Sequence, residues 1–317
     1  MNENRTGIHP ETERKLTGGI VMKFGGASLR NSESVRESCQ AVGYFIDQNY
    51  SPVVVVSAAQ GITDLLRAVY DNRGNTNVTS EIFRSIVELQ TDIVIGLGMD
   101  RDNTLTTLKN VYKDCVNLSN QVFNPDSSSQ PYAIYDQIVA TGEKMSAHTV
   151  AGYMASQGRA TFALSSEHIV ITDDNFGGAR PDRDATKIRA QGIIRGAVRR
   201  RGDRTPIITG FIGATQEGAI TTLGSNSSDH SAVLFAEALD LHDVFFMKDV
   251  DGLFKSTQQI GDPHSLIDTI SIQDLAKIPG HDKILCENVK KIALESNIRL
   301  HILNYQRPDR IGTTITP

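Results

Sequence analysis

The sequence predicts an α/β protein built around a mainly parallel sheet. An apolar strand, a loop of small residues and a helix follow one another twice, first from Gly19–Phe24 and again from Pro52–Val56. The second strand carries four consecutive valines, which is typical of a central parallel strand covered on both faces. Ligands of such sheets bind at the carboxyl ends of the strands, so we expect the functional residues along that edge.

The composition limits the class of protein. The chain has 317 residues, of which 39% are hydrophobic and 22% charged, and its net charge is -5. These values fit a globular protein and give no sign of a nucleic-acid surface. Three widely spaced cysteines argue for reduced thiols rather than a disulfide frame or a zinc site. No apolar run reaches a membrane span, and residues 1–18 resemble a flexible tail, so we expect a cytoplasmic protein.

The first predicted strand runs directly into a small-residue turn. Gly25, Gly26 and Ser28 lie between the strand and a predicted helix, and Lys23 stands at the end of the strand. Glycines let backbone N–H groups approach an anion closely, and a lysine adds a positive charge for phosphate oxygens. The Walker spacing is absent, so this is not a P-loop. A structural turn with no ligand is the alternative.

The second predicted strand is followed by Ser57 and Thr63, whose hydroxyls can bind a ligand or cap the helix expected from Leu65. Helices are predicted over most of residues 65–130, with polar loops at 72–80 and 123–131. These helices carry no chemistry that the sequence identifies.

Glu143 is predicted in the first turn of a helix that includes residues 137–146. Its negative charge would be favourable there because of the helix dipole. The functional alternative is a carboxylate that holds a substrate ammonium group. Further strands are predicted at Phe162–Leu164 and Ile169–Ile171, with an exposed loop at 172–179.

The chain is organised around Thr221–Phe254, which combines a polar turn, a helix and a buried strand that ends in acidic residues. A strand and a hairpin with Gly218 at its bend are followed by a Ser- and Asn-rich turn and then by a helix. Ser228 and Asp229 fall where this helix begins, and the backbone N–H groups at such an end attract phosphate oxygens. The alternative is that both residues only cap the helix.

A later predicted strand, Val244–Met247, ends in Lys248 and Asp249, with Asp251 close behind. The two aspartates could bind Mg²⁺ through water or hold a ribose, although aspartates are also ordinary turn residues. Strands are also predicted at Leu300–Leu303 and near Gly312–Ile315.

Seven motifs in this order resemble the catalytic domain of aspartate kinases, within the amino-acid kinase superfamily: Lys23–Ser28, Val54–Asp64, Gly142–Glu143, Gly210–Gly213, Thr221–Gly224, Ser228–Asp229 and Asp249–Gly252. The resemblance implies a three-layer α/β/α sandwich around a mainly parallel sheet, the carbamate kinase-like fold. It also implies one kinase domain over residues 19–317, with a substrate lobe (19–205) and a nucleotide lobe (206–317).

The implied reaction is ATP-dependent phosphorylation of the side-chain carboxylate of L-aspartate, with Mg²⁺, to give 4-phospho-aspartate. Because the reference pKa of aspartate is about 3.9, the acceptor is already ionised at neutral pH and needs no general base. By the same resemblance, Lys23 and Asp229 are catalytic. The implied substrate-binding residues are Ser57, Thr63, Glu143, Phe176, Ser225 and Ser228. The implied nucleotide-binding residues are Gly25, Gly26, Ser28, Lys248, Asp249, Gly252, Phe254 and Lys283.

The chain also departs from the family pattern. Ser225 stands where the family has an arginine that grips a substrate carboxylate, which puts unmodified aspartate in doubt as the acceptor. Lys248 replaces a usual threonine, Phe254 replaces a tyrosine, and an insertion at 255–261 lies beside the expected adenine site.

The regulatory ACT modules that usually follow in the family are absent from the sequence, so feedback inhibition through them is not expected. Members of the family usually associate, so the resemblance implies a homodimer. Two other functions stay open beside aspartate phosphorylation. One is phosphorylation of a different small amino acid or carboxylate in a specialised pathway. The other is a weakly catalytic, nucleotide-binding relative that acts as a regulatory subunit.

Overall fold

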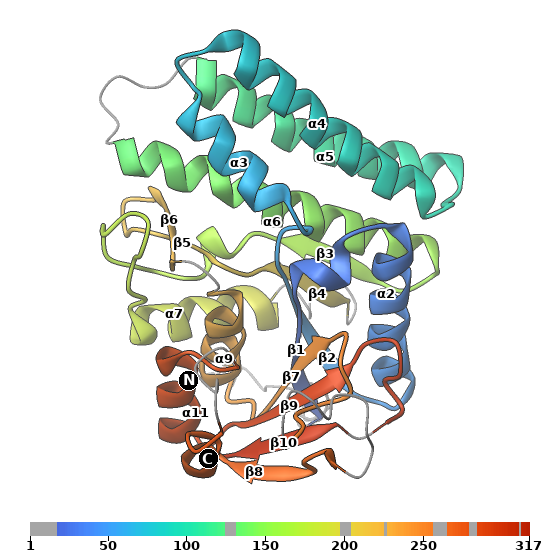
Figure 1. Cartoon of the computed structure of the whole chain (residues 1–317), viewed down its shortest axis with the longest axis vertical. Coiled ribbons are helices and arrows are strands. Elements are labelled where there is room, and N and C mark those ends of the chain that lie inside the picture. The colour runs from blue at the N-terminus through green and yellow to red at the C-terminus, as the bar shows by residue number, and fades with distance from the viewer. Residues whose placement is uncertain are drawn as a thin grey trace, which may run out of the picture.

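A computed structural model describes residues 18–123, 131–196, 204–224, 227–255, 265–278, 284–310 and 312–317, and these form a three-layer α/β/α sandwich (Figure 1). Its central sheet has eight strands. Their order across the sheet is β3 (Thr161–Leu164), β4 (Thr205–Thr209), β2 (Ser51–Val56), β1 (Gly19–Phe24), β7 (Asp243–Lys248), β9 (Arg299–Asn304), β10 (Thr313–Thr316) and β8 (Thr269–Ser271). All neighbouring pairs are parallel except β9 and β10, which confirms the predicted fold class.

Both faces of the sheet are buried, as the run of valines in β2 predicts. Met22 and Val54 pack on the face covered by α2 (Ser32–Asp47) and α6 (Pro131–Ser156). Val21 packs on the opposite face, against α9 (Ser228–Ala238). Side chains alternate along a strand, so Lys23 lies on the same face as Val21, the face covered by α9.

A further layer of helices lies beyond α6 (Figure 1). It contains α3 (Ile62–Asp71), α4 (Thr76–Gly96) and α5 (Arg101–Phe123), in agreement with the predicted helical region. The loop predicted at 72–80 is shorter than expected, because the Asn75 side chain accepts a hydrogen bond from Val78 N–H and starts α4 at once. The loop predicted at 123–131 falls almost wholly outside the described residues.

The strand predicted at Ile169–Ile171 is wrong. Ile171 makes only an isolated bridge to Ala214, and its backbone N–H donates to the hydroxyl of Thr186, near the start of α7 (Arg183–Ala190). The backbone N–H groups of Ile169 and Val170 donate to the Ser166 carbonyl, so the backbone of this apolar run bonds to the preceding turn, the hairpin and the start of α7 rather than to the main sheet.

The hairpin predicted before α9 is confirmed. It consists of β5 (Ile212–Ala214) and β6 (Ile220–Thr222), which pair antiparallel, and Gly218 at the bend has a positive φ of 91°. Strand β8 and two helices, α10 (Ile272–Leu275) and α11 (Glu287–Glu295), were not predicted from the sequence. None of the helices in the described ranges has both the length and the apolar character that a membrane crossing needs.

Candidate active site

Lys23 and Asp229 meet at the carboxyl edge of the sheet. Lys23 is near the end of β1, and Asp229 lies in the first turn of α9. The Nζ of Lys23 is 2.5 Å from Oδ1 of Asp229, and their side chains are only 8% and 18% exposed. The residue before α9, Ser227, makes no side-chain capping bond. Asp229 therefore acts as the partner of a buried lysine rather than only as a helix cap.

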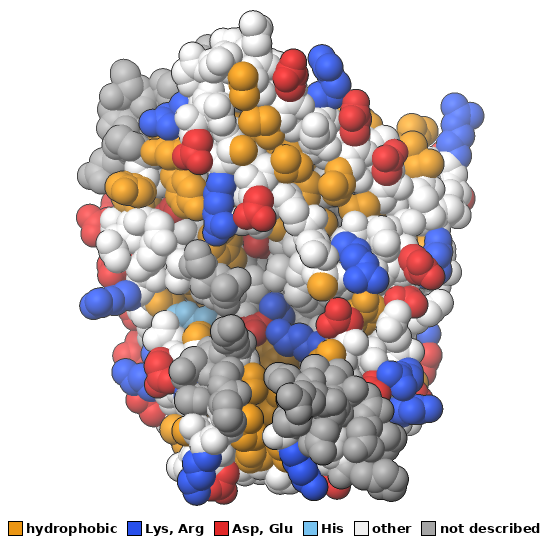
Figure 2. Space-filling model, in the orientation of Figure 1, with side chains coloured by type: hydrophobic (Ala, Val, Ile, Leu, Met, Phe, Trp, Pro, Cys, Tyr) orange, Lys and Arg blue, Asp and Glu red, His pale blue; other side chains and the backbone are white. Residues whose placement is uncertain are grey.

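Lys248 reaches the same carboxylate from the neighbouring strand. Lys23 is paired in register with Phe246, so Lys23, Phe246 and Lys248 all lie on the face of the sheet covered by α9. The Nζ of Lys248 is 3.5 Å from Oδ2 of Asp229, and the lysine side chain is 35% exposed. The space-filling view shows basic and acidic side chains together in a hollow at the middle of the molecule (Figure 2).

The ionisation of this cluster follows from burial and from its neighbours. Burial lowers the pKa of Lys23, and the charge of Lys248 lowers it further, while Asp229 opposes both. Burial by itself would raise the pKa of Asp229, but the two ammonium groups outweigh it and hold that pKa below its ordinary value. Asp229 is consequently an ionised carboxylate placed between two lysines.

Glu143 lies in the middle of α6 and not in the first turn of a helix, because α6 already begins at Pro131. The prediction of a helix-dipole role for this residue is wrong. Its side chain is buried, and burial raises its pKa to about 8, although a hydrogen bond from Ala58 N–H and the charge of Lys23 oppose that rise. Among the described residues, Oε2 of Glu143 has no hydrogen-bond partner. Buried polar groups are usually hydrogen-bonded, so this oxygen is available to bind a ligand.

Close backbone packing brings α6 and the two strand-end loops together. A Cβ on Gly142 would lie 2.8 Å from the Cβ of Ala58, and a Cβ on Gly26 would lie 3.0 Å from the carbonyl oxygen of Ala58. Neither position tolerates a larger residue without movement of its neighbours. Both glycines thus allow Glu143 and the loop after β1 to pack against the loop after β2.

Asp136 is a central residue of the site region that the sequence analysis missed. It is fully buried in α6 and accepts three hydrogen bonds: from Gly177 N–H, from Thr222 N–H and from the hydroxyl of Thr222. Asp136 and Glu143 are about two helical turns apart, on one face of α6. Recognising the true start of α6 would have revealed that face. Asp136 joins α6, the loop around Phe176 and the β5–β6 hairpin.

The structure places the other predicted substrate residues as follows. Thr63 is half-buried in the first turn of α3, Ser57 is half-buried directly after β2, and Ser228 is buried in the first turn of α9. Phe176 is half-buried in the loop that Asp136 anchors through Gly177. Ser225 lies outside the described residues.

On the nucleotide side, Lys283 is also outside the described residues. Gly25 and Gly26 follow β1 directly, and the buried Ser28 hydroxyl donates to the Gly25 carbonyl. Asp249 is exposed after β7, and Phe254 is half-buried and bridges to Leu266.

Asp251 and Gly252, which follow Asp249 in the segment after β7, both contact neighbouring protein atoms. Asp251 accepts a hydrogen bond from Asn304 and pairs with Arg307 at 2.7 Å, so one of its oxygens is already engaged. Gly252 has a φ of 148°, and a Cβ there would lie 2.6 Å from the Thr313 hydroxyl. Within the described ranges, no group of three or more His, Cys, Asp or Glu side chains could hold a metal ion.

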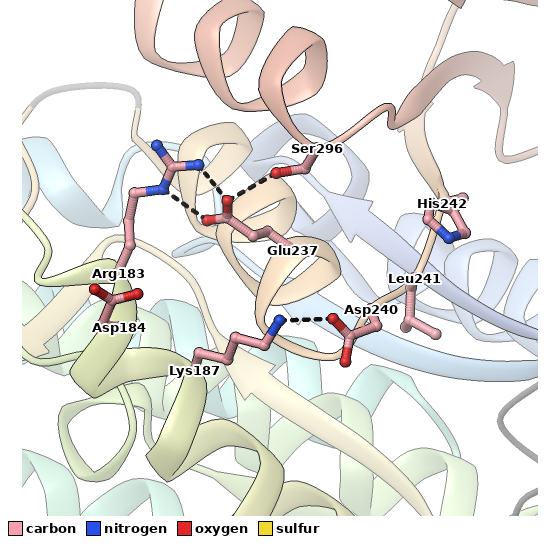
Figure 3. Close-up of a pocket in the computed structure, with 8 residues that line it drawn as sticks. All are labelled: Arg183, Asp184, Lys187, Glu237, Asp240, Leu241, His242 and Ser296. Carbon is pink, nitrogen blue, oxygen red and sulfur yellow. Dashed lines mark hydrogen bonds and ion pairs between the residues drawn. The ribbon is translucent and has the colours of Figure 1, made fainter.

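A separate cavity of about 380 Å³ lies at the other end of α9 (Figure 3). Arg183 from α7 pairs there with Glu237, which also accepts from Ser296, and Lys187 pairs with Asp240 at 2.7 Å. These ion pairs and hydrogen bonds join α7, α9 and α11 around the cavity. The Lys23–Asp229 pair lies instead at the N-terminal end of α9.

The fold agrees with the comparisons with known proteins. The model of the amino acid kinase family matches residues 19–304. The chain belongs to the amino acid kinase family. The family match includes the strands that carry Lys23 and Lys248 and the helix that carries Asp229.

Among curated proteins, the chain resembles members of this family named as aspartokinases. It is 26% identical to the aspartokinase of Chlamydia muridarum over 93% of this chain and 63% of the relative. It is 28% identical to the chloroplastic aspartokinase 3 of Arabidopsis thaliana over 96% of this chain and 54% of the relative. The chain therefore spans less than two thirds of the length of these relatives.

Solved structures with a similar fold include an aspartokinase and a carbamate kinase. Aspartokinase III of Escherichia coli, in complex with aspartate and ADP, superimposes with a TM-score of 0.80 at 26% identity, over 94% of this chain and 64% of that one. Carbamate kinase of Giardia lamblia, bound to AMP-PNP, superimposes with a TM-score of 0.53 at 10% identity, over 94% of this chain and 98% of that one. This second likeness concerns the fold alone.

Proposed function

We propose that this member of the amino acid kinase family is an ATP-dependent kinase that phosphorylates the side-chain carboxylate of L-aspartate. The observation that carries the proposal is the buried ion pair between Lys23 and Asp229, where β1 ends and α9 begins. The similarity to an aspartokinase that binds aspartate and ADP supports this choice of substrates.

In this proposal, Glu143 binds the acceptor's ammonium group. This role is supported by its burial, by an oxygen that has no partner within the described residues, and by its electrostatic interaction with Lys23. Ser57, Thr63, Phe176, Ser225 and Ser228 complete the acceptor site. Asp136 positions Phe176 for this role, because it accepts a hydrogen bond from the backbone N–H of the next residue, Gly177.

The proposed nucleotide site lies on the other side of the Lys23–Asp229 pair. Gly25 lies beside the ammonium group of Lys23, since a Cβ there would stand 3.6 Å from Nζ, and a glycine lets backbone N–H groups approach a phosphate closely. The N-terminal end of α9 adds backbone N–H groups that favour an anion. The other proposed nucleotide contacts are Gly26, Ser28, Lys248, Asp249, Gly252, Phe254 and Lys283. Mg²⁺ bound with the triphosphate would neutralise phosphate charge, with the exposed Asp249 as a protein ligand, direct or through water.

The reaction needs positioning and charge dispersal rather than a general base. A carboxylate oxygen of the acceptor forms a bond to the γ-phosphorus, and the bond from that phosphorus to the β–γ bridging oxygen breaks, leaving ADP. The acceptor is ionised at neutral pH, so no proton has to be removed. Lys23 stabilises the charge on the transferred phosphoryl group, and Asp229 keeps the lysine protonated and pointed at it.

A second candidate is a kinase for a different small carboxylate. The observation that favours it is Ser225, which stands where aspartate kinases have a carboxylate-gripping arginine. An acceptor whose second carboxylate is modified or missing would not need that arginine.

A coupled ADP-release assay tests the proposal, combined with hydroxylamine trapping of the acyl phosphate. The panel contains L-aspartate, its analogues with modified or missing carboxylates, and other amino acids. We expect aspartate-dependent ADP release and an aspartyl hydroxamate, both lost in Lys23→Ala but kept in Lys291→Ala, which removes an exposed lysine of α11. Turnover of an analogue but not of aspartate would favour the second candidate, and silence across the panel despite ATP binding would refute both.

A further inference from the structure

The two outermost helices, α4 and α5, expose apolar side chains to solvent. They lie side by side beyond α6 and run in opposite directions (Figure 1). Eight large hydrophobic side chains are exposed in the described part of the chain, and half of them belong to these two helices: Ile95, Leu105, Tyr112 and Val116. The last three recur on α5 at intervals of seven and four residues, so they share one side of that helix. Exposed apolar side chains that gather in this way mark a surface that binds another one.

A contact between hydroxyl groups joins the exposed sides of the two helices. The hydroxyl oxygens of Thr91 on α4 and Tyr112 on α5 are 3.0 Å apart, in an exposed position. The exposed residues of 81–95 and of 101–116 therefore form one continuous surface, which we call the α4–α5 face.

The charges on the α4–α5 face are separated by sign. Helix α4 exposes three acidic residues and one basic residue, whereas α5 exposes three basic residues and one acidic residue. They are Glu81, Arg84, Glu88 and Asp92 on α4, and Arg101, Asp102, Lys109 and Lys113 on α5. Among the residues that the structure describes, none of these eight side chains takes part in an ion pair. An acidic helix thus lies beside a basic one, and the charges of both are available to a partner.

A second copy of the chain complements this face. In a two-fold symmetric pair, the same surface binds to itself and each contact occurs twice. A two-fold axis that lies between the two helices and parallel to them places α4 of one copy on α5 of the other. The acidic helix then meets the basic helix in both halves of the interface, and the apolar side chains are buried between the copies.

The size of the face also fits a dimer. The two helices have 21 and 23 residues, so each is roughly 30 Å long and about 10 Å wide. The face therefore offers on the order of 600 Å² per copy, which lies at the lower end of the range for specific interfaces. A nucleic acid or an anionic membrane fits less well, because the acidic residues of α4 would repel the phosphates of either.

We propose that the α4–α5 face is a dimer interface and that its partner is a second copy of this chain. The family resemblance implies a homodimer, and this face supplies a surface for it. The inference is independent of the proposed function, because none of its residues belongs to the candidate active site.

Sedimentation equilibrium of the full chain, over a wide range of concentrations, measures the dissociation constant of the dimer. Lys109→Glu combined with Lys113→Glu makes both helices acidic, and Glu81→Lys combined with Glu88→Lys makes both basic. We expect each double variant to raise the dissociation constant at least about a hundredfold, because like charges then face one another across the interface. An equimolar mixture of the two variants should form a heterodimer, in which opposite charges meet again.

A control reverses two exposed lysines on other helices, Lys277→Glu with Lys291→Glu, and should leave the dissociation constant unchanged. Recovery on mixing distinguishes a lost contact from a folding defect, and circular dichroism checks the fold of each variant. A chain that stays monomeric at every concentration, or a dimer that survives both charge reversals, would overturn the proposal. So would two folded, monomeric variants whose mixture also stays monomeric.

Discussion

Lys23 and Asp229 come from distant parts of the chain, yet they form an ion pair of 2.5 Å at the point where β1 ends and α9 begins. Desolvation makes a buried ammonium costly, so the pair persists only because each charge stabilises the other.

Replacing Asp229 by Asn should impair both catalysis and stability. Without the carboxylate, Lys23 and Lys248 repel each other, and the buried Lys23 has no counter-charge. We expect kcat to fall at least about a hundredfold, which corresponds to about 2.7 kcal/mol of lost stabilisation. Urea unfolding should show a loss of roughly 3 kcal/mol. Asp240→Asn, at the exposed C-terminal end of α9, should change kcat little. Near-normal kcat in Asp229→Asn would contradict the role given to this residue.

The KM for the acceptor should depend on pH through Glu143. Its pKa is about 8 in the folded protein because the side chain is buried, so below pH 8 it is mostly neutral. Pairing with an ammonium group requires the ionised form, and binding then has to release a proton. KM should therefore fall as pH rises from about 6 to 8 and level off above 8. Glu143→Gln should have a high KM without this dependence. A flat profile in the unchanged protein would argue against Glu143 as the ammonium ligand.

The same carboxyl group should make stability depend on pH. Its folded pKa of about 8 lies above the ordinary value of 4.5, so the folded state keeps a proton that the unfolded state loses. The contribution to stability is complete below pH 4.5 and is lost as pH rises toward 8. Glu143→Gln should consequently gain stability relative to the unchanged protein over this interval, by an amount on the order of a few kcal/mol. Chemical denaturation of both proteins across that range measures it, and parallel curves would contradict the prediction.

Asp136→Asn should destabilise the protein although the two side chains have nearly the same shape. Asp136 accepts from the backbone N–H groups of Gly177 and Thr222 and from the Thr222 hydroxyl. An amide turns one acceptor into a donor that faces another donor. We expect a loss of about 2 kcal/mol in urea unfolding, and a raised acceptor KM because the loop with Phe176 loosens. Asp92→Asn on the exposed face of α4 is the matched control. Unchanged unfolding would show that the three hydrogen bonds matter little.

Much of the fold was predictable because the strands of the sheet carry strong local signals. The valines of β2 are buried on both faces and can be recognised without tertiary information. The isolated run Ile169–Ile171 carries a similar signal, but its hydrogen-bond partners, Ala214 and Thr186, come from distant elements. A local pattern cannot show which partners a strand-like segment finds.

The site was predictable where residue type and position coincide. Lys23 at a strand end and Asp229 at a helix start were selected from the sequence, and the structure brings them together. Asp136 was missed, because its role depends on loops that only tertiary packing brings to α6. The environment of Lys248 was equally hidden, since the pairing of β1 with β7 decides which strand ends are neighbours.

A double-mutant cycle on kcat tests most directly whether Lys23 and Asp229 act as one unit on the transferred phosphoryl group. The variants are Lys23→Met, Asp229→Asn and the double mutant, assayed by ADP release with the acceptor at saturation. Residues that act together are strongly non-additive, so the double mutant should lose about as much kcat as the more damaging single mutant. If instead the two losses multiply, the residues act independently and the central claim is wrong.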